Sequence, residues 1–263
     1  MIYDLQKASI GKRISAFILD VILFAILAVG AAAIVSEALN YDYYADRLEQ
    51  IQAECFVEQV GEDYKDRGIM PGITEAEYNE LSAADRLLYD KAQRAFATNK
   101  EANEVYSKLL SYVFLITNLG TFISCIVLEF VVPLFLRNGQ TVGKKVFGIG
   151  VMLKNGVRIN SVALFSRSML GKFAIETALP MLAVTMLFLG TSNLLMLAVA
   201  ILVIVLNVGL LLFHRENTVI HDIVSYTVCV DLASQMIFDN EAAMIEYKNR
   251  VHQEANELDT YRY

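Results

Sequence analysis

Long apolar stretches separated by polar segments are the main pattern of this sequence. Four of them approach the roughly 20 residues that a helix needs to cross a bilayer. They cover residues 14–35, 109–136, 173–189 and 194–213. The fourth contains no charged residue, which is typical of a helix in lipid and unusual for a helix in water. The pattern therefore predicts four membrane-spanning helices; the alternative is a water-soluble protein built from buried apolar helices.

The composition agrees with membrane burial, since 56% of the residues are hydrophobic and 19% are charged, against about 25% charged in soluble domains. The first stretch follows a basic segment, as a signal peptide does. It is longer than the 7–15 residues of a usual signal core and it contains Asp20, so we expect a retained anchor. Only residues 190–193 separate the third and fourth stretches, which predicts an antiparallel helical hairpin.

Charge is distributed unevenly between the segments outside these stretches. Residues 137–172 hold seven basic and no acidic residues, whereas residues 37–107 hold 16 acidic and 7 basic residues, a net charge of −9. Short loops rich in Lys and Arg stay on the cytoplasmic side. We therefore expect residues 137–172 and both termini in the cytoplasm, and residues 37–107 outside.

The fold class expected is an all-α integral membrane protein, a four-helix transmembrane bundle with an extracytoplasmic helical insert and a small cytoplasmic β-hairpin. We divide the chain into four parts, which are an N-terminal stub with the first span (1–36), the acidic insert (37–107), the remaining three spans with the basic loop (108–230), and a polar, weakly helical or disordered tail (231–263).

The insert is expected to hold two helical segments on either side of Pro71-Gly72. Thr74-Glu75-Ala76-Glu77 has the form of a capping box and is expected to start the second segment. A solvated structural hairpin and a binding module both fit this pattern. A disulfide from the lone Cys55 of the insert would have to be intermolecular.

The basic loop contains a turn signal. Asn155-Gly156 lies between apolar runs at 146–153 and 157–159, which predicts the β-hairpin. The following residues 161–172 have helical spacing, and their cations Arg167 and Lys172 suit an interfacial helix beside anionic lipid as well as they suit a ligand-binding role. The run from Gly139 to Lys145 is not a phosphate-binding loop, because its glycines are one residue too close and no Ser or Thr follows the lysine.

Ionisable residues inside the predicted spans are costly in lipid and are therefore candidates for function. Asp20 and Glu129 are the candidate residues of an ion or substrate pathway. Arg13, Asp222 and Arg167 are the candidates for a charge gate at the cytoplasmic side. Arg13 and Asp20 are about 10 Å apart along one helix, so each is expected to meet a partner from elsewhere. The alternative role for all five is a structural ion network.

Three motifs resemble the RDD family of membrane proteins, which is named for one arginine and two aspartates. They are the start of the first span from Arg13 to Asp20, the run Gly139-Gln140-Thr141-Val142-Gly143-Lys144-Lys145 followed by Gly148-Ile149, and His221-Asp222 leading into residues 223–228. The resemblance covers residues 7–36 and 108–230 and leaves out the insert and the tail. It implies that Arg13, Asp20 and Asp222 are the named residues, and that the protein lies in a bacterial inner membrane. It implies no general mechanism, although the family includes transport-related proteins.

Two functions fit these observations. The first is transport of an ion or small solute, with the pathway shared between subunits of a homo-oligomer because four helices are few for one. The second is a non-transporting accessory protein that binds another membrane protein through the insert or the basic loop. We expect no enzyme, since the sequence carries no nucleophile or metal-ligand motif. We also expect no cofactor, no metal and no nucleic acid, and we expect the lipid bilayer as the partner of the basic loop.

Overall fold

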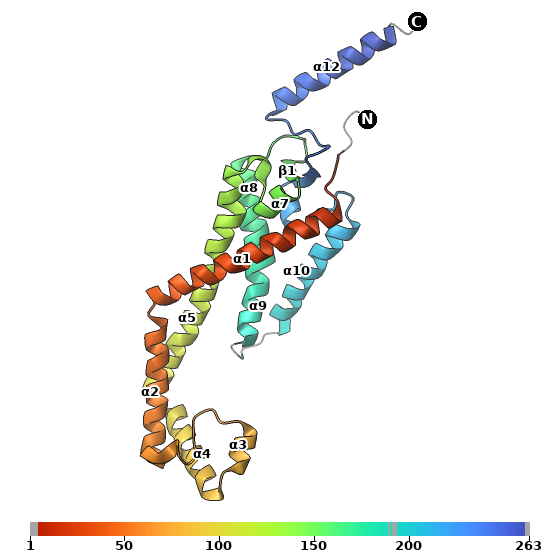
Figure 1. Ribbon diagram of the computed structural model, residues 1–263. Coiled ribbons are helices and arrows are strands. Elements are labelled where there is room, and N and C mark those ends of the chain that lie inside the picture. Colours follow the sequence, from red (N-terminus) through yellow and green to blue (C-terminus); the bar gives the residue numbers. More distant parts are fainter. Residues whose placement is uncertain (1–4, 189, 191–193, 261–263) are drawn as a thin grey trace. The chain divides into compact units, whose positions relative to one another are not determined.

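The computed structural model describes residues 5–188, 190 and 194–260 (Figure 1). The chain forms two compact units, and each is described by itself. The core unit comprises residues 1–31 and 120–263, and the insert unit comprises residues 32–119. Four helices are long and apolar enough to cross a membrane, and they coincide with the four predicted stretches; they are Ile10–Ala38, Lys100–Phe135, Ser161–Phe188 and Leu194–Phe213.

The first two of these helices differ in regularity. The first is a single element, α1 (Ile10–Ala38). The second begins as α5 (Lys100–Cys125), passes through the π-helical segment η2 (Ile126–Val131) and ends as α6 (Val132–Phe135). π-Helical geometry is rare and is found mostly at functional or otherwise constrained positions. Glu129 lies within η2, so this irregularity coincides with an ionisable residue.

The third long helix also changes geometry along its length. It consists of α8 (Ser161–Phe165), the π-helical η4 (Ser166–Ala178) and α9 (Leu179–Phe188). The predicted helix over residues 161–172 is present, but it continues without a break into the apolar stretch and does not end as an interfacial helix. No proline and no pair of glycines interrupts the helix at the expected boundary. Lys172 is half-buried and does not point toward lipid.

The fourth helix, α10 (Leu194–Phe213), runs antiparallel beside α9 (Figure 1). This agrees with the predicted helical hairpin. Gly190 has the left-handed φ of 68° that favours glycine at a helix end. The other three residues of the predicted turn, 191–193, lie outside the described residues.

The core unit also contains a two-stranded antiparallel sheet of β1 (Ile149–Leu153) and β2 (Thr227–Asp231). Ile149 lies opposite Asp231 and Leu153 opposite Thr227. The predicted hairpin is therefore wrong in its main strand partner. The Asn155-Gly156 turn does form, since Leu153 N donates to Val157 O at 2.9 Å, but only the single bridge Met152–Arg158 follows it.

Pairing with β2 buries more of β1 than pairing with residues 157–159 would, because β1 is buried on both of its faces. Four consecutive residues of each strand are buried, and β2 is long enough to cover all of β1. The N-terminal segment lies along the other edge of β2, with Asp231 N donating to Gln6 O at 2.9 Å and Ala8 N to Cys229 O at 3.1 Å. The sheet therefore joins the start, the middle and the end of the core unit.

Shorter elements complete the core unit. They are η3 (Arg137–Gly139), α7 (Val142–Val146), α11 (Ile220–Val224) and α12 (Glu241–Thr260). The tail is thus a defined helix where the sequence suggested weak helicity or disorder. Ala8, Ile149, Val151, Leu164 and Cys229 are among the buried residues at the centre of the unit.

The insert unit is helical, as predicted. It contains α2 (Tyr41–Val60), η1 (Glu62–Tyr64), α3 (Glu75–Glu80) and α4 (Ala83–Thr98), followed by the first part of α5. The predicted capping box at Thr74 is confirmed, with both reciprocal hydrogen bonds to Glu77 present. The expected second segment is two helices, because Ser82 caps α4 separately through Asp85 N.

The insert unit has its own apolar core. Phe56, Tyr64, Ile69 and Ala92 form one buried cluster, and Ile51, Cys55 and Ala102 form another. Arg47 joins α2 to the first turn of α5 through Glu101, at 2.8 Å. Two cores of this kind indicate a folded module and not a flexible connection.

Candidate functional site

Asp222 lies at the centre of a buried ion cluster in the core unit. Its carboxylate accepts hydrogen bonds from Arg13 Nη2 at 2.8 Å and from Arg167 Nη1. It also accepts from the backbone N–H of Val219 at 3.2 Å, so it caps the first turn of α11. Arg167 Nη1 donates further to Thr227 Oγ1 at 2.6 Å. One carboxylate therefore joins α1, η4 and α11.

The burial of this cluster is nearly complete. The side chain of Asp222 is 0% exposed, and those of Arg13 and Arg167 are 9% and 7% exposed. Burial raises the pKa of Asp222, but Arg167, His221 and Arg13 outweigh burial and hold the pKa below its usual range. Asp222 is therefore ionised at neutral pH. Two cations share one anion here, and Nη1 of Arg13 is buried with no hydrogen-bond partner among the described residues.

Asp20 lies apart from this cluster, at the N-terminus of α7. Its carboxylate accepts from the hydroxyl of Thr141 and from the backbone N–H of Gly143, the latter at 2.7 Å. Carboxylates are favoured at helix N-termini because they satisfy free N–H groups there. Gly143 is required by the close approach of α1, since a Cβ at that position would lie 2.2 Å from Ala16 O.

These contacts explain the Gly-Gln-Thr-Val-Gly-Lys run in structural terms. Gln140 Nε2 donates to Ile149 O at 2.8 Å, Thr141 binds Asp20, and Gly143 makes room for α1. The run thus docks the loop against the first long helix. Burial lowers the pKa of Lys144, the next residue, against the opposing attraction of Glu129.

Glu129 forms an ion pair with Lys172, and the pair joins the two π-helical segments η2 and η4. Ser168 Oγ supports the contact by donating to the backbone oxygen of Glu129 at 2.8 Å. The expectation that Arg167 and Lys172 face anionic lipid is wrong. Both cations turn inward because buried carboxylates, Asp222 and Glu129, offer them stronger and less screened partners than a headgroup does.

His221 lies between Glu176 and the Asp222 cluster. Its Nδ1 lies 2.8 Å from Glu176 Oε2, its backbone N–H donates to Glu176 Oε1 at 2.9 Å, and its Nε2 lies 3.8 Å from Asp222. The sequence pairs His221 with its neighbour Asp222, but Glu176 is the closer partner. Burial and the nearby Arg167 lower the pKa of His221, so its ring is neutral at pH 7.

The five predicted site residues therefore form two groups. Arg13, Arg167 and Asp222 meet directly, whereas Asp20 and Glu129 bind separate partners. Thr141, Lys172, Glu176 and Thr227 complete the sites, and sequence reasoning gave none of them these roles. No sequence signal pairs Glu129 with Lys172, because Lys172 precedes the third apolar stretch and belongs to the basic segment 137–172.

Each long helix contains a long segment without charged residues. Residues 21–36, 109–128, 177–188 and 194–213 contain no Asp, Glu, Lys, Arg or His. At 1.5 Å per residue these segments extend over roughly 18–30 Å. In the described part of the chain, no group of three His, Cys, Asp or Glu side chains is arranged to hold a metal ion.

Comparison with known proteins places the chain in a family. The model of the RDD family matches residues 7–226. The chain belongs to the RDD family. No curated protein and no solved structure matches it. Within this RDD chain, Arg13 and Asp222 are in direct contact, and Asp20 fixes the loop that carries the glycine motif.

Proposed function

We propose that this RDD protein is a four-span integral membrane protein that acts as a non-transporting accessory, with the insert unit as its binding module. Both termini and residues 137–172 would lie in the cytoplasm and the insert outside, in a bacterial inner membrane. The positive-inside rule and the apolar side chains of the long helices support this placement. Val29 on α1 is 71% exposed and Leu195 on α10 is 73% exposed, which is costly in water and favourable in lipid.

The observation that carries the proposal is the closed ion network. Each intramembrane carboxylate accepts from a defined partner, so none is left free to bind a passing ion. Asp20 binds Thr141 and Gly143, Glu129 binds Lys172, and Glu176 binds His221. Beyond this network, long segments of all four helices lack Asp, Glu, Lys, Arg and His. A network of this kind fixes how helices pack and offers no continuous polar route across a bilayer.

The insert supports the second half of the proposal. It departs from the compact pattern expected of the family, it has two apolar clusters of its own, and residues 37–107 carry a net charge of −9. A module that is folded and strongly charged is suited to binding another protein.

Transport by a homo-oligomer is the alternative, with Asp20 and Glu129 as ligands of a proton or cation. One observation favours it. Lys172 and Glu176 lie about one turn apart on η4 and each contacts a further titratable group, Glu129 and His221 respectively, which gives a short chain of groups able to exchange protons.

A flux measurement separates the two functions. Purified wild-type protein in proteoliposomes is expected to move no more protons, Na⁺ or K⁺ than empty vesicles, and Asp20→Asn is expected to behave identically. Flux above the empty-vesicle level that Asp20→Asn abolishes would refute the accessory function and support transport.

A deletion tests the role of the insert directly. Residues 42–104 are replaced by a short Gly-Ser linker, and partners are captured by crosslinking in membranes before purification. The deletion is expected to lose the crosslinked partner while Arg13→Gln and Asp20→Asn retain it. Retention after deletion would contradict the proposal. A reporter fused near Gln52 tests the topology, and a cytosolic signal there would overturn it.

A further inference from the structure

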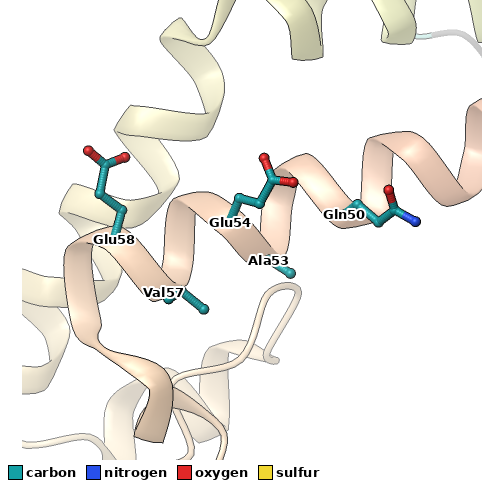
Figure 2. A pocket seen from close by; sticks show the side chains of 5 residues that line it. All are labelled: Gln50, Ala53, Glu54, Val57 and Glu58. Carbon is teal, nitrogen blue, oxygen red and sulfur yellow. The ribbon is translucent and has the colours of Figure 1, made fainter.

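Two hollows of the structure differ in how they are enclosed. One has a volume of about 500 Å³ and lies on the outer face of α2, beside Glu54, Val57 and Glu58 (Figure 2). All of its lining residues belong to that single helix, so no second wall faces a ligand there. The other has a volume of about 200 Å³ and is lined by four segments of the core unit, which are residues 133–136, 138–139, 158–161 and Leu164. Because it has walls on several sides, this second hollow is the candidate binding site, and we call it the α6–α8 pocket.

The size of the α6–α8 pocket limits what it can hold. Small-molecule sites usually measure roughly 300–1,000 Å³, so a volume of about 200 Å³ suits a group of few heavy atoms. Two of the walls pack directly against each other, since a Cβ on Gly139 would lie 2.7 Å from Ile159 Cγ2. Gly139 therefore permits the close approach of η3 to the segment that precedes α8.

The α6–α8 pocket lies where two of the long helices end. The second long helix ends at Phe135, and the third begins at Ser161. Phe135 is 84% exposed, and Val162, which follows the lining residue Ser161, is 77% exposed. Exposed apolar side chains of this kind are favourable in lipid. In the proposed placement of the chain, the pocket therefore lies at the cytoplasmic boundary of the membrane, with an apolar rim.

Inside this apolar rim the pocket presents polar groups. The side chains of Asn138 and Ser161 make no hydrogen bond within the described part of the chain. The side-chain oxygen of Asn160 accepts from Ala163 N at 2.7 Å, which leaves its amide hydrogens free. Two amides and one hydroxyl are therefore available as hydrogen-bond donors to a ligand.

Arg158 gives the pocket a positive charge. None of the lining residues is acidic, and residues 137–172 hold seven basic and no acidic residues. Arg158 Nη2 lies 2.7 Å from Asp239 Oδ1, but the two side chains are 44% and 68% exposed, so solvent weakens the pair. A guanidinium has five N–H donors and can bind a phosphate through two of them at once. Arg158 thus stays accessible, whereas Arg167 and Lys172 turn inward to buried carboxylates.

We propose that the α6–α8 pocket binds the phosphate ester of a membrane lipid headgroup. The phosphate accepts hydrogen bonds from Arg158 and from the free donors of Asn138 and Ser161, and the acyl chains lie against Phe135 and Val162. A cationic, polar pocket with an apolar rim matches an amphipathic ligand, and basic pockets between membrane helices on the cytoplasmic side commonly hold lipid headgroups. The inference goes beyond the proposed accessory function and rests only on the proposed placement of the chain in the membrane.

Native mass spectrometry of the full-length protein in detergent measures the binding. Three probes separate the possible sources of the ligand. They are phosphatidylglycerol, a diacylglycerol with the same acyl chains and no phosphate, and free glycerol phosphate, which has no acyl chains. Phosphatidylglycerol is expected to bind at concentrations at which neither of the other two does, because it alone carries both parts.

Two pairs of variants test the residues of the pocket. Arg158→Gln removes its cation and is expected to weaken phosphatidylglycerol binding by about tenfold or more. The matched control Lys145→Gln removes the charge of an exposed lysine that does not line the pocket, and it is expected to leave binding nearly unchanged. Ser161→Leu fills the pocket without changing the charge and is expected to weaken binding as strongly. Its control is Val162→Leu, one residue further along.

An unchanged melting temperature shows that each variant is folded. Equal weakening by Arg158→Gln and Lys145→Gln would indicate general charge attraction and overturn the inference. Unchanged binding by Ser161→Leu, or equal binding of the diacylglycerol, would also overturn it. Free glycerol phosphate that binds as tightly as the lipid would overturn the lipid as the source of the phosphate. The reporter near Gln52 tests the membrane placement separately, so an extracytoplasmic signal there with unchanged lipid binding in all variants would refute only the pocket.

Discussion

Asp222→Asn is the most informative single substitution in this chain. The carboxylate is completely buried and holds Arg13 and Arg167. The asparagine keeps the shape and one acceptor oxygen, but it leaves two guanidinium groups in the interior without an anion. The variant therefore isolates the contribution of charge.

The magnitude follows from the burial of all three groups. Removing one partner of a buried ion pair costs about 3–5 kcal/mol because the remaining charge is uncompensated. For a unit of this size each kcal/mol lowers the melting temperature by about 2–4 °C, so Asp222→Asn is expected to lower it by about 6–20 °C. Arg167→Met is expected to cost less, since Arg13 and Asp222 remain as a neutral pair.

Thermal unfolding of the purified protein in detergent, followed by circular dichroism of its helices, measures these shifts. The matched control is Asp231→Asn, which removes the 2.6 Å contact with Lys12 at a site where the two side chains are 23% and 41% exposed. Solvent screens that pair, so its loss is expected to change the melting temperature far less. Equal shifts for Asp222→Asn and Asp231→Asn, or a larger loss for Arg167→Met, would refute the reasoning.

Three further predictions concern other parts of the chain. Gly143→Ala is expected to lower stability by about 1–3 kcal/mol through overpacking against Ala16 and Asp20, seen as a lower melting temperature, and a variant as stable as wild type would contradict the contact. Burial lowers the pKa of His221 below the 6.5 of the unfolded chain, so the unfolded state binds more protons than the folded state below that pH. The free energy of unfolding is therefore highest above pH 6.5 and falls as the pH drops below it. In His221→Gln the melting temperature is expected to depend less on pH between about pH 7.5 and 5.5. Burial raises the pKa of the Cys55 thiol, which makes it less reactive. Peptide mapping after maleimide treatment is therefore expected to find this thiol unlabelled until the insert unfolds. Rapid labelling of the folded protein would contradict the burial of Cys55 between the helices of the insert.

The sequence predicts the long helices well because their signal is local. Residues 194–213 are apolar except for Asn207 and contain no charged residue, so the segment predicts a membrane-spanning helix whatever surrounds it. The same holds for the Thr74 capping box, which depends on residues three positions apart.

Contacts between distant residues were harder to predict. The nearest turn signal, Asn155-Gly156, predicts that strand β1 pairs with residues 157–159. Its observed partner β2 lies some 75 residues later and is favoured by the apolar area that it buries. Lys172 likewise reads as a surface cation from its neighbours, and only the position of Glu129 on another helix draws it inward. The spacing of apolar residues shows which face of a helix or strand is buried. It does not show which other helix or strand packs against that face.

The contact between Asp222 and two arginines also constrains the order of assembly. Ribosomes make Arg13 and Arg167 long before Asp222, so both cations must wait, hydrated or bound to lipid phosphate, until the carboxylate follows the last long helix. Residues 227–231 arrive later still and complete the sheet that seals the cluster. A chain that ends before residue 222 therefore contains both arginines but lacks the carboxylate that pairs with them.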